Sequence, residues 1–403
     1  MKQFKAFFSG VSLLLLFSLV LTAGVMGIAD YSIPDSLSVF RGEDPAVSGI
    51  VTFSMGEELP ISAHATRTSA TARLFGILPL KEVEVTTFDT LSLCPGGEVF
   101  GIRMLLGGAL ITSVTKVIDG DGRERYPARE AGLAPGDLIT AVDGREIRDA
   151  ATLSSCIASS EGRSLTLTVL RGGRTLSLRL TPRYSASAGA YRAGILVKDQ
   201  AAGIGTVTFV DPATGAFGGL GHGVYDTESA RLLPLERGVV SDVRLSGVIA
   251  GAPGDPGELR GHLGNERRGT LLSNTECGVF GILSATEELH EAIPIGLSSS
   301  VRVGAATILC TLEDGKCGSY DIEITEIRDR HAATKCFTVR VTDPDLLAMT
   351  GGIVQGMSGS PIIQNGRLIG AVTHVMIGDP TAGYGIFIEN MLNAAQMPQA
   401  RAS

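Results

Sequence analysis

The sequence predicts a mainly β protein of two or three domains that begins with a single transmembrane helix. Glycine is frequent, with 52 residues among 403, whereas aromatic residues reach only 5% and tryptophan is absent. This composition is typical of short strands joined by tight turns. The chain is also longer than the roughly 100–200 residues of one domain. The third observation is a long apolar segment near the N-terminus.

Charge and hydropathy exclude two classes of protein. Lys and Arg number 34 and Asp and Glu 42, which gives a formal net charge of −8. Binding to nucleic acid needs a concentrated basic surface, so nucleic acid is not an expected partner. Hydrophobic residues make up 44% of the chain and charged residues 19%, which excludes a mostly disordered protein.

The apolar segment, residues 6–29, contains no charged side chain. As a helix it is about 36 Å long at ~1.5 Å per residue, enough to cross a hydrocarbon layer of about 30 Å. Lys2 and Lys5 precede it and Asp30 follows, so the positive-inside rule places the body of the protein outside the cytoplasm. We expect residues 1–30 to be the retained anchor of a single-pass protein. The alternative is a cleaved signal peptide.

Two regions follow the anchor. Residues 31–91 are predicted to be a spacer with a small β element near 74–88, where apolar and polar residues alternate. Residues 92–183 predict a separate domain, because residues 165–180 read as an antiparallel hairpin with a turn at Arg171–Arg174. A short helix is expected at 149–160, with Asp149 as its N-cap.

The second of these regions carries a motif. Residues 131–139 (AGLAPGDLI), followed by Val142-Asp143-Gly144, resemble the A-G-L-x-x-G-D-x-I…V-x-G signature of PDZ domains. That resemblance implies binding of an extended peptide at a strand edge. The loop that binds a terminal carboxylate is then expected just upstream, with the peptide-binding residues Val99, Phe100, Gly101 and Ile102.

The last region, residues 187–403, has many short predicted strands and contains Gly356-Met357-Ser358-Gly359-Ser360-Pro361. This segment resembles the G-x-S-G-G-P loop of chymotrypsin-like peptidases, which implies a double β-barrel with Ser358 as nucleophile. A glycine at 356 lets the turn aim the N–H groups of Gly356 and Ser358 at one oxyanion. Thr373 and His374, on the next strand, are predicted to contact substrate.

A serine hydroxyl needs a base to accept its proton. We predict His222, which glycines flank on both sides, as that base, with His374 as its rival. The base in turn needs a carboxylate to hold its tautomer. Asp343, which ends a strand-like run before Pro344, is the predicted acid; Asp345 and Asp226 remain alternatives.

No cofactor or metal is expected for this chemistry, since the chain has no zinc or nucleotide motif. A metal enzyme based on His222 and Asp226 is therefore disfavoured. The six cysteines are interpreted as buried thiols, although Cys310 and Cys317 flank a predicted hairpin turn and a disulfide between them is the alternative. The cysteines are Cys94, Cys156, Cys277, Cys310, Cys317 and Cys336.

The order of anchor, spacer, PDZ-like region, G-H-G-V-Y-D at 221–226 and G-M-S-G-S-P-I-I-Q-N-G at 356–366 resembles the stage IV sporulation protein B peptidases of spore-forming Firmicutes. The resemblance implies a His222, Asp343 and Ser358 triad. It also implies a role between mother cell and forespore. There the peptidase would cleave a membrane-bound regulator that restrains an intramembrane metalloprotease, and so release a late mother-cell sigma factor.

Other functions remain open from the residues alone. One is a PDZ-based membrane scaffold with a degenerate protease barrel, and another is an HtrA-like quality-control protease. The sequence also leaves open whether the spacer is cleaved by the enzyme itself to release a soluble form.

Overall fold

The computed structural model describes residue 24 and residues 33–45, 50–62, 65–284, 290–313 and 316–395. The predicted anchor lies outside this part of the chain, except for Gly24. None of the helices in the described residues is long and apolar enough to cross a membrane. Two compact units are present, residues 1–91 with 297–300 and the rest of the chain, and each is described by itself.

The first unit contains a five-stranded sheet in the order β1-β5-β4-β2, with β3 paired to β4. Strand β1 is parallel to β5, and the other pairs are antiparallel. The predicted β element at 74–88 is confirmed as β5, but it belongs to a whole sheet whose small core the sequence analysis missed. The strands are β1 (Ser36–Phe40), β2 (Val51–Met55), β3 (Leu59–Ser62), β4 (Ala65–Leu74) and β5 (Leu78–Phe88). Their core contains Ile33, Ala70, Ala72, Val83 and Val85.

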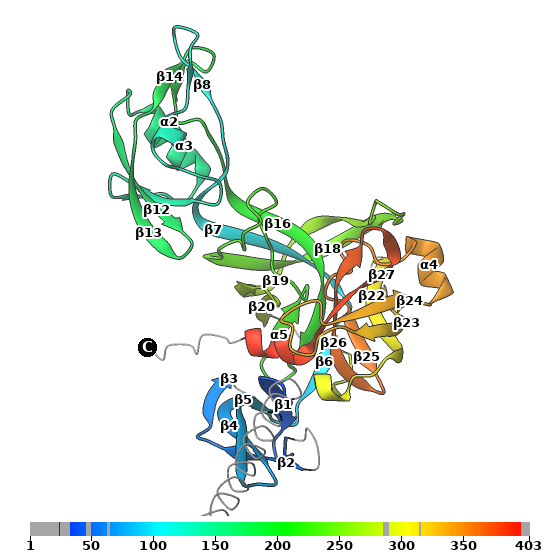
Figure 1. The fold of residues 1–403 in the computed structure, drawn as a ribbon. Helices are drawn as coiled ribbons and strands as arrows, with labels where there is room; N and C mark the ends of the chain where they lie inside the picture. Colours follow the sequence, from blue (N-terminus) through cyan, green and yellow to red (C-terminus); the bar gives the residue numbers. More distant parts are fainter. Residues whose placement is uncertain are drawn as a thin grey trace, which may run out of the picture. The chain divides into compact units, whose positions relative to one another are not determined.

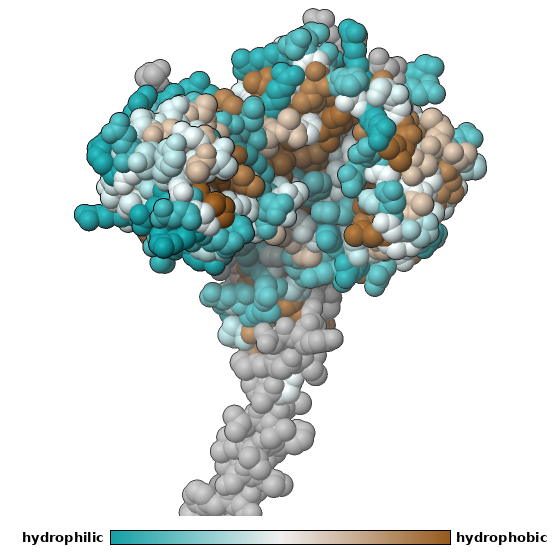
Figure 2. All heavy atoms as spheres, turned by 90° about the horizontal axis from the view of Figure 1, so that it is seen from above, coloured by the Kyte–Doolittle hydropathy of each residue, from teal (hydrophilic) through white to brown (hydrophobic). Residues whose placement is uncertain are grey.

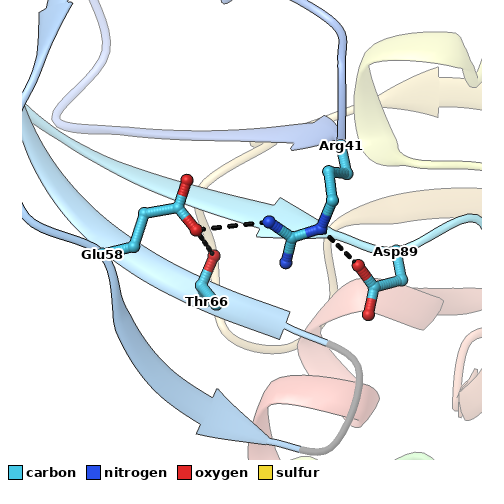
Figure 3. A network of polar contacts seen from close by, with 4 residues as sticks. All are labelled: Arg41, Glu58, Thr66 and Asp89. Atoms are coloured by element: carbon cyan, nitrogen blue, oxygen red, sulfur yellow. Dashed lines mark hydrogen bonds and ion pairs between the residues drawn. The ribbon is translucent and has the colours of Figure 1, made fainter.

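A polar network lies at one end of this sheet (Figure 3). Arg41 Nε donates to Asp89 Oδ1 at 2.6 Å, and Arg41 Nη1 donates to Glu58 Oε2 at 3.3 Å. Thr66 Oγ1 donates to the same glutamate oxygen at 2.9 Å. The charged side chains are nearly half exposed, and exposed pairs of this kind contribute about 0–1 kcal/mol. The sheet is therefore stabilised mainly by its apolar core.

The second unit begins with a six-stranded barrel. Strands β7, β18, β19, β20, β17 and β16 pair in that order, and the pairing of β16 with β7 closes the ring. Phe100, Phe217 and Val279 are among the buried side chains that fill it. The barrel strands, with β6 and β21 at its side, are β6 (Ser92–Pro95), β7 (Val99–Val114), β16 (Ile195–Val210), β17 (Ala216–Gly219), β18 (Arg237–Ile249), β19 (Glu258–Thr275), β20 (Gly278–Leu283) and β21 (Ile293–Pro294).

A second closed barrel follows in the order β22-β23-β24-β27-β26-β25. Two six-stranded barrels in sequence confirm the predicted double-barrel architecture. The elements are η1 (Ser298–Ser300), β22 (Gly304–Glu313), β23 (Lys316–Ile327), β24 (Phe337–Val341), α4 (Pro344–Thr350), β25 (Pro361–Gln364), β26 (Arg367–Met376), β27 (Asp379–Phe387) and α5 (Ile388–Ala394).

A smaller domain is inserted between two paired strands of the first barrel. β7 and β16 run out of the barrel side by side, from Val99 opposite Thr206 to Val114 opposite Ile195, and their far ends join a separate core (Figure 1). The predicted helix and hairpin are confirmed as α3 and β12–β13. The elements are β8 (Val117–Ile118), β9 (Glu124–Arg125), α2 (Pro127–Glu130), β10 (Leu138–Val142), β11 (Arg145–Glu146), α3 (Ala150–Ala158), β12 (Leu165–Arg171), β13 (Arg174–Leu180), β14 (Arg183–Ser185) and β15 (Ala190–Arg192).

This insertion corrects the prediction for Val99, Phe100, Gly101 and Ile102. These residues are not a peptide-binding loop, because they form the barrel end of β7: all four pair with β16, and Gly101 and Ile102 also pair with β18. Phe100 and Ile102 are buried in the barrel core. Alternating apolar residues after a glycine turn suit both a PDZ strand and a barrel strand, so the pattern did not distinguish them. The domain expected from residue 92 therefore starts inside β7.

All six cysteines are free thiols, but only Cys94, Cys310 and Cys336 are buried as predicted, whereas the other three are partly exposed. Cys310 lies opposite Gly318 and Cys317 lies opposite Thr311, so the two sulfur-bearing residues are one position out of register. The hairpin itself forms as expected.

Candidate active site

The predicted nucleophile loop, residues 351–360, connects α4 to β25. Gly356 has a φ of +100°, and a Cβ there would lie 2.9 Å from Leu259 Cβ. Gly359 has a φ of +99°, and its Cβ would lie 2.0 Å from the Thr206 carbonyl oxygen. Because only glycine combines positive φ with such close approach, both glycines are required by the turn.

Strand β16 of the first barrel holds this loop. The Thr206 hydroxyl donates to the Gly356 carbonyl at 2.8 Å, and the Thr206 N–H donates to the Ser358 carbonyl at 3.0 Å. Two residues along, Thr208 Oγ1 donates to the Gly359 carbonyl at 2.8 Å. Both threonines are fully buried. Sequence reasoning missed them, although two threonines two positions apart in an apolar strand are a signal of polar groups on one buried face.

Two amides of the loop are available to a ligand. Met357, Gly359 and Ser360 donate their N–H groups to main-chain carbonyls. Within the described part of the chain, the N–H groups of Gly356 and Ser358 have no acceptor. These are the two donors predicted to stabilise an oxyanion, and unpaired amides beside a nucleophile are the arrangement that this chemistry requires.

The serine chosen from the motif is the accessible one. Ser358 is partly exposed, and its Oγ donates to the Thr373 carbonyl at 2.7 Å. Ser360 is fully buried and cannot meet a substrate. In this state the Ser358 hydroxyl bonds to the main chain, so it must rotate about χ1 before a base can accept its proton.

The predicted base, His222, follows β17 through an unusual turn. Leu220 and Gly221 both have positive φ, +67° and +66°. His222 Nδ1 lies 2.8 Å from the Gly223 carbonyl oxygen. With Nδ1–H donating to that carbonyl, Nε2 carries the lone pair that a base needs. The imidazole also stacks on His374, with ring centroids 4.7 Å apart.

The segments that carry Ser358 and His222 are adjacent. A Cβ on Gly359 would lie 2.5 Å from the Leu220 nitrogen. The carbonyl that binds Ser358 Oγ belongs to Thr373, the residue directly before His374. The structure thus brings nucleophile, base and the two amides to one region, although no hydrogen bond joins Ser358 to His222 in the described residues.

Both imidazoles are neutral at ordinary pH. Burial lowers the pKa of His222, the hydrogen bond to the Gly223 carbonyl partly opposes this, and the Lys335 charge adds a smaller lowering. Burial, the neighbouring His222 and Lys335 lower the pKa of His374 to about 4. A neutral imidazole is the form that accepts a proton.

Asp343 makes no hydrogen bond to His222 in the described residues, so its place in the triad stays a prediction. Its Oδ1 accepts from the N–H groups of Asp345 at 3.0 Å and Leu346 at 2.9 Å, and Oδ2 accepts from Asp321 N–H at 3.2 Å. Asp343 is therefore the N-cap of α4, and hydrogen bonds from Leu346, Asp321 and Asp345 lower the pKa of its carboxyl. The proline that ends the strand at this point also begins a helix, which sequence reasoning missed.

The alternative acids do not reach the base either. Asp226 is buried, ion-paired with Lys198, and accepts from Ser229 Oγ at 2.7 Å. Burial alone would raise its pKa, but the bonds from Lys198 and Ser229 outweigh burial and lower it. Asp345 is exposed in the first turn of α4. In the described residues the hydrogen-bond partner of His222 Nδ1 is the Gly223 carbonyl instead of a carboxylate.

The two residues predicted to contact substrate, Thr373 and His374, differ in exposure. Thr373 is fully buried, and its Oγ1 donates to the Tyr384 carbonyl at 3.2 Å. Its side chain therefore does not contact substrate, and it contributes a carbonyl to Ser358 instead. His374 is partly exposed beside His222, and its Nδ1 has no hydrogen-bond partner in the described residues. Contact between His374 and substrate stays a prediction.

The inserted domain has its own groove. A cavity of about 400 Å³ lies between helix α3 and two backbone segments, residues 115–118 and 193–197. Leu196 lines it and is 57% exposed. Hydrophobic side chains elsewhere on the molecule also gather in separate patches, as the face drawn in Figure 2 shows. A strand edge facing a helix suits an extended peptide, and the start of β16 supplies such an edge here.

Replacement of Thr206 by valine should slow catalysis. The Gly356 carbonyl would lose its hydroxyl donor inside a buried site, which costs roughly 1–3 kcal/mol. Loss of this bond should misplace the two oxyanion amides in the transition state. We therefore expect kcat to fall by about tenfold or more with little change in KM. Steady-state kinetics of Thr206→Val and Thr206→Ser, which keeps the hydroxyl, test this. A valine variant with wild-type kcat would contradict it.

Removal of the Lys335 charge should shift the acid limb of the pH–rate profile. A nearby cation disfavours the imidazolium and lowers the pKa of His222, so its loss raises that pKa. Activity of Lys335→Met should therefore fall at a higher pH than in the wild type, while Lys335→Arg keeps the original profile. Profiles of kcat/KM against pH measure the shift, and an unchanged or opposite shift would refute it.

Comparison with known proteins agrees with this architecture. Residues 118–171 match the model of the PDZ domain, and residues 189–392 match the model described as SpoIVB peptidase S55. The metalloprotease MmpA of Caulobacter vibrioides is 36% identical over 87 residues, 21% of each chain. The chain spans about a fifth of the length of the curated relatives it matches.

The similarity to solved structures is weaker. The HtrA-type protease AlgW with a decapeptide matches at a TM-score of 0.30 and 12% identity, over 50% of this chain and 53% of that one. The active form of the Rv3671c protease from M. tuberculosis matches at a TM-score of 0.30 and 15% identity, over 49% and 76%.

The matched peptidase region covers the nucleophile loop, the candidate base and both threonines of β16, and it amounts to just over half of the 403 residues. The chain belongs to the SpoIVB peptidase S55 family and contains a PDZ domain.

Proposed function

We propose that this peptidase acts in sporulation signalling, anchored by residues 1–30, with its body in the space between mother cell and forespore. Its substrate is a membrane-bound regulator that restrains an intramembrane metalloprotease, and cleavage leads to processing of a late mother-cell sigma factor. Family membership supports this role. The observation that carries the chemistry is the accessible Ser358 hydroxyl beside two unpaired loop amides.

The proposed reaction is acyl transfer through Ser358. The hydroxyl leaves the Thr373 carbonyl and gives its proton to His222 as Oγ attacks the peptide carbonyl carbon. The N–H groups of Gly356 and Ser358 stabilise the oxyanion. His222 then protonates the leaving amine, and the C–N bond breaks to give an acyl-enzyme. Water, activated by the same imidazole, hydrolyses the ester and restores Ser358.

The imidazole is oriented by the main chain in this scheme. The Gly223 carbonyl accepts from Nδ1–H and fixes the tautomer, a task that a carboxylate performs in most related enzymes. A carbonyl has no full charge with which to stabilise the imidazolium. Burial and Lys335 already disfavour the imidazolium, so the resting site holds a neutral base.

The PDZ groove selects the substrate in this proposal. A peptide that pairs with β16 near Leu196 gains main-chain hydrogen bonds, and the groove side chains set its identity.

Labelling by a fluorophosphonate probe tests the nucleophile. Ser358→Ala should abolish both labelling and cleavage of the regulator. Ser360→Ala serves as the matched control and should retain both, because Ser360 is buried. Labelling that survives in Ser358→Ala, or that is lost only in Ser360→Ala, would overturn the assignment and favour a scaffold with a degenerate barrel.

A groove substitution should separate substrate selection from chemistry. Leu196→Asp places a charge in the groove, and kcat/KM for the regulator should fall about tenfold while probe labelling of Ser358 stays at the wild-type rate. Leu105→Asp is the control, because Leu105 is similarly exposed on β7 but does not line the groove. Equal loss of cleavage in both variants, or loss of labelling in Leu196→Asp, would contradict the division of roles.

A further inference from the structure

Three potential metal ligands meet at a point outside the peptidase centre. Glu98 lies in the turn between β6 and β7, His290 precedes β21, and Cys317 lies on β23. One carboxylate oxygen, one ring nitrogen and the sulfur all lie within 4.8 Å of one another. His290 Nε2 and Glu98 Oε1 are 3.5 Å apart. We infer that Glu98, His290 and Cys317 bind a zinc ion.

The donor set and the spacing both suit zinc. Thiolate, imidazole and carboxylate are its usual protein ligands, at about 2.3, 2.0–2.1 and 2.0–2.2 Å. A tetrahedral ion with such bonds separates its ligand atoms by roughly 3.3–3.8 Å. The histidine and glutamate atoms already have this separation, and a small side-chain adjustment brings the sulfur to it. Three protein ligands leave the fourth position for water.

The backbone around the site is fixed by other contacts. Gly97 has a φ of +118°, and a Cβ on it would lie 2.5 Å from the Cys317 sulfur, so a glycine is needed for the turn to approach. Thr311 Oγ1 donates to the Gly97 carbonyl at 2.9 Å, and Val207 N–H donates to the Glu98 carbonyl at 3.0 Å. Ion binding therefore needs movement of side chains only, which favours a preformed site.

The position of the site indicates what the ion would do. Glu98 leads into β7 of the first barrel, whereas Cys317 belongs to β23 of the second barrel. An ion shared by these residues links the two barrels that supply His222 and Ser358. None of its ligands belongs to the catalytic group. The expected role is structural, and the ion raises the stability of the joined barrels.

Titration of the metal-depleted full-length protein with Co²⁺ tests the site. One Co²⁺ should bind per chain, with a thiolate-to-cobalt charge-transfer band and the visible absorption of a tetrahedral ion, and Zn²⁺ should displace it. Cys317→Ser should lose the charge-transfer band, whereas Cys156→Ser, which alters a cysteine on α3, should keep it. Glu98→Gln should weaken Co²⁺ binding at least tenfold. Glu313→Gln is the control, because Glu313 lies on the β22–β23 hairpin that also carries Cys317.

Two further measurements use Zn²⁺ itself. Zn²⁺ should protect Cys317 of the wild-type protein from alkylation by iodoacetamide, as read by peptide mass spectrometry, and should leave the reactivity of Cys156 unchanged. The melting temperature should rise with Zn²⁺ in the wild type and not in Cys317→Ser. Absence of a thiolate band, a band that persists in Cys317→Ser, or unprotected Cys317 at saturating Zn²⁺ would each refute the site.

Discussion

The hydrogen bonds between Thr206 and the nucleophile loop are the constraint on which the active site depends. The loop lies in the second barrel, and the strand that holds it lies in the first. One threonine binds two carbonyls of the loop, those of Gly356 and Ser358, and thereby fixes the peptide planes between them. The Ser358 N–H belongs to the peptide plane flanked by these two carbonyls, and the Gly356 N–H belongs to the plane just before them, so the bonds from Thr206 restrain the loop around both donors. The geometry of the loop therefore depends on the contact between the two barrels. His222, which follows β17 of the first barrel, lies at the same contact.

In the described residues no carboxylate hydrogen-bonds to the base, His222, so the charge of its imidazolium lacks the usual support. An imidazole that gains a proton in a buried site needs compensation for its charge. Here the surroundings oppose that charge through burial and through Lys335. His374 stacks on the ring but is itself neutral, with a pKa of about 4. In this state the Ser358 hydroxyl also donates to the Thr373 carbonyl instead of to His222. Neither the proton donor, Ser358, nor the acceptor, His222, is therefore arranged for proton transfer.

The sequence predicted the hairpin, the helix and the turn glycine Gly356, because these rest on local periodicity or on a backbone conformation that glycine adopts. The two barrels were expected from the resemblance of the nucleophile loop to chymotrypsin-like peptidases. The sequence did not predict which fold the strand at 99–102 belongs to, since both candidate folds need the same alternation. The capping role of Asp343 was not foreseen, because a capping aspartate and a catalytic aspartate have the same chemistry before a proline. Thr206, and the cluster of Glu98, His290 and Cys317, join residues distant in the chain, and only the tertiary fold brings them together.

Insertion of the PDZ domain into a barrel hairpin has a mechanical consequence. β16 is one continuous strand, and about ten residues, or roughly 33 Å of extended chain, separate the groove at Leu196 from Thr206. Most of that distance is paired to β7, with shifts of register at Leu196–Val197 and Lys198–Gln200, so a peptide added at the groove extends a sheet that also contains the support of the nucleophile loop. A domain attached by a flexible linker could deliver substrate but could not transmit strain. In this fold, substrate binding and loop geometry share one strand, because the chain enters and leaves the PDZ domain through neighbouring strands of the catalytic barrel.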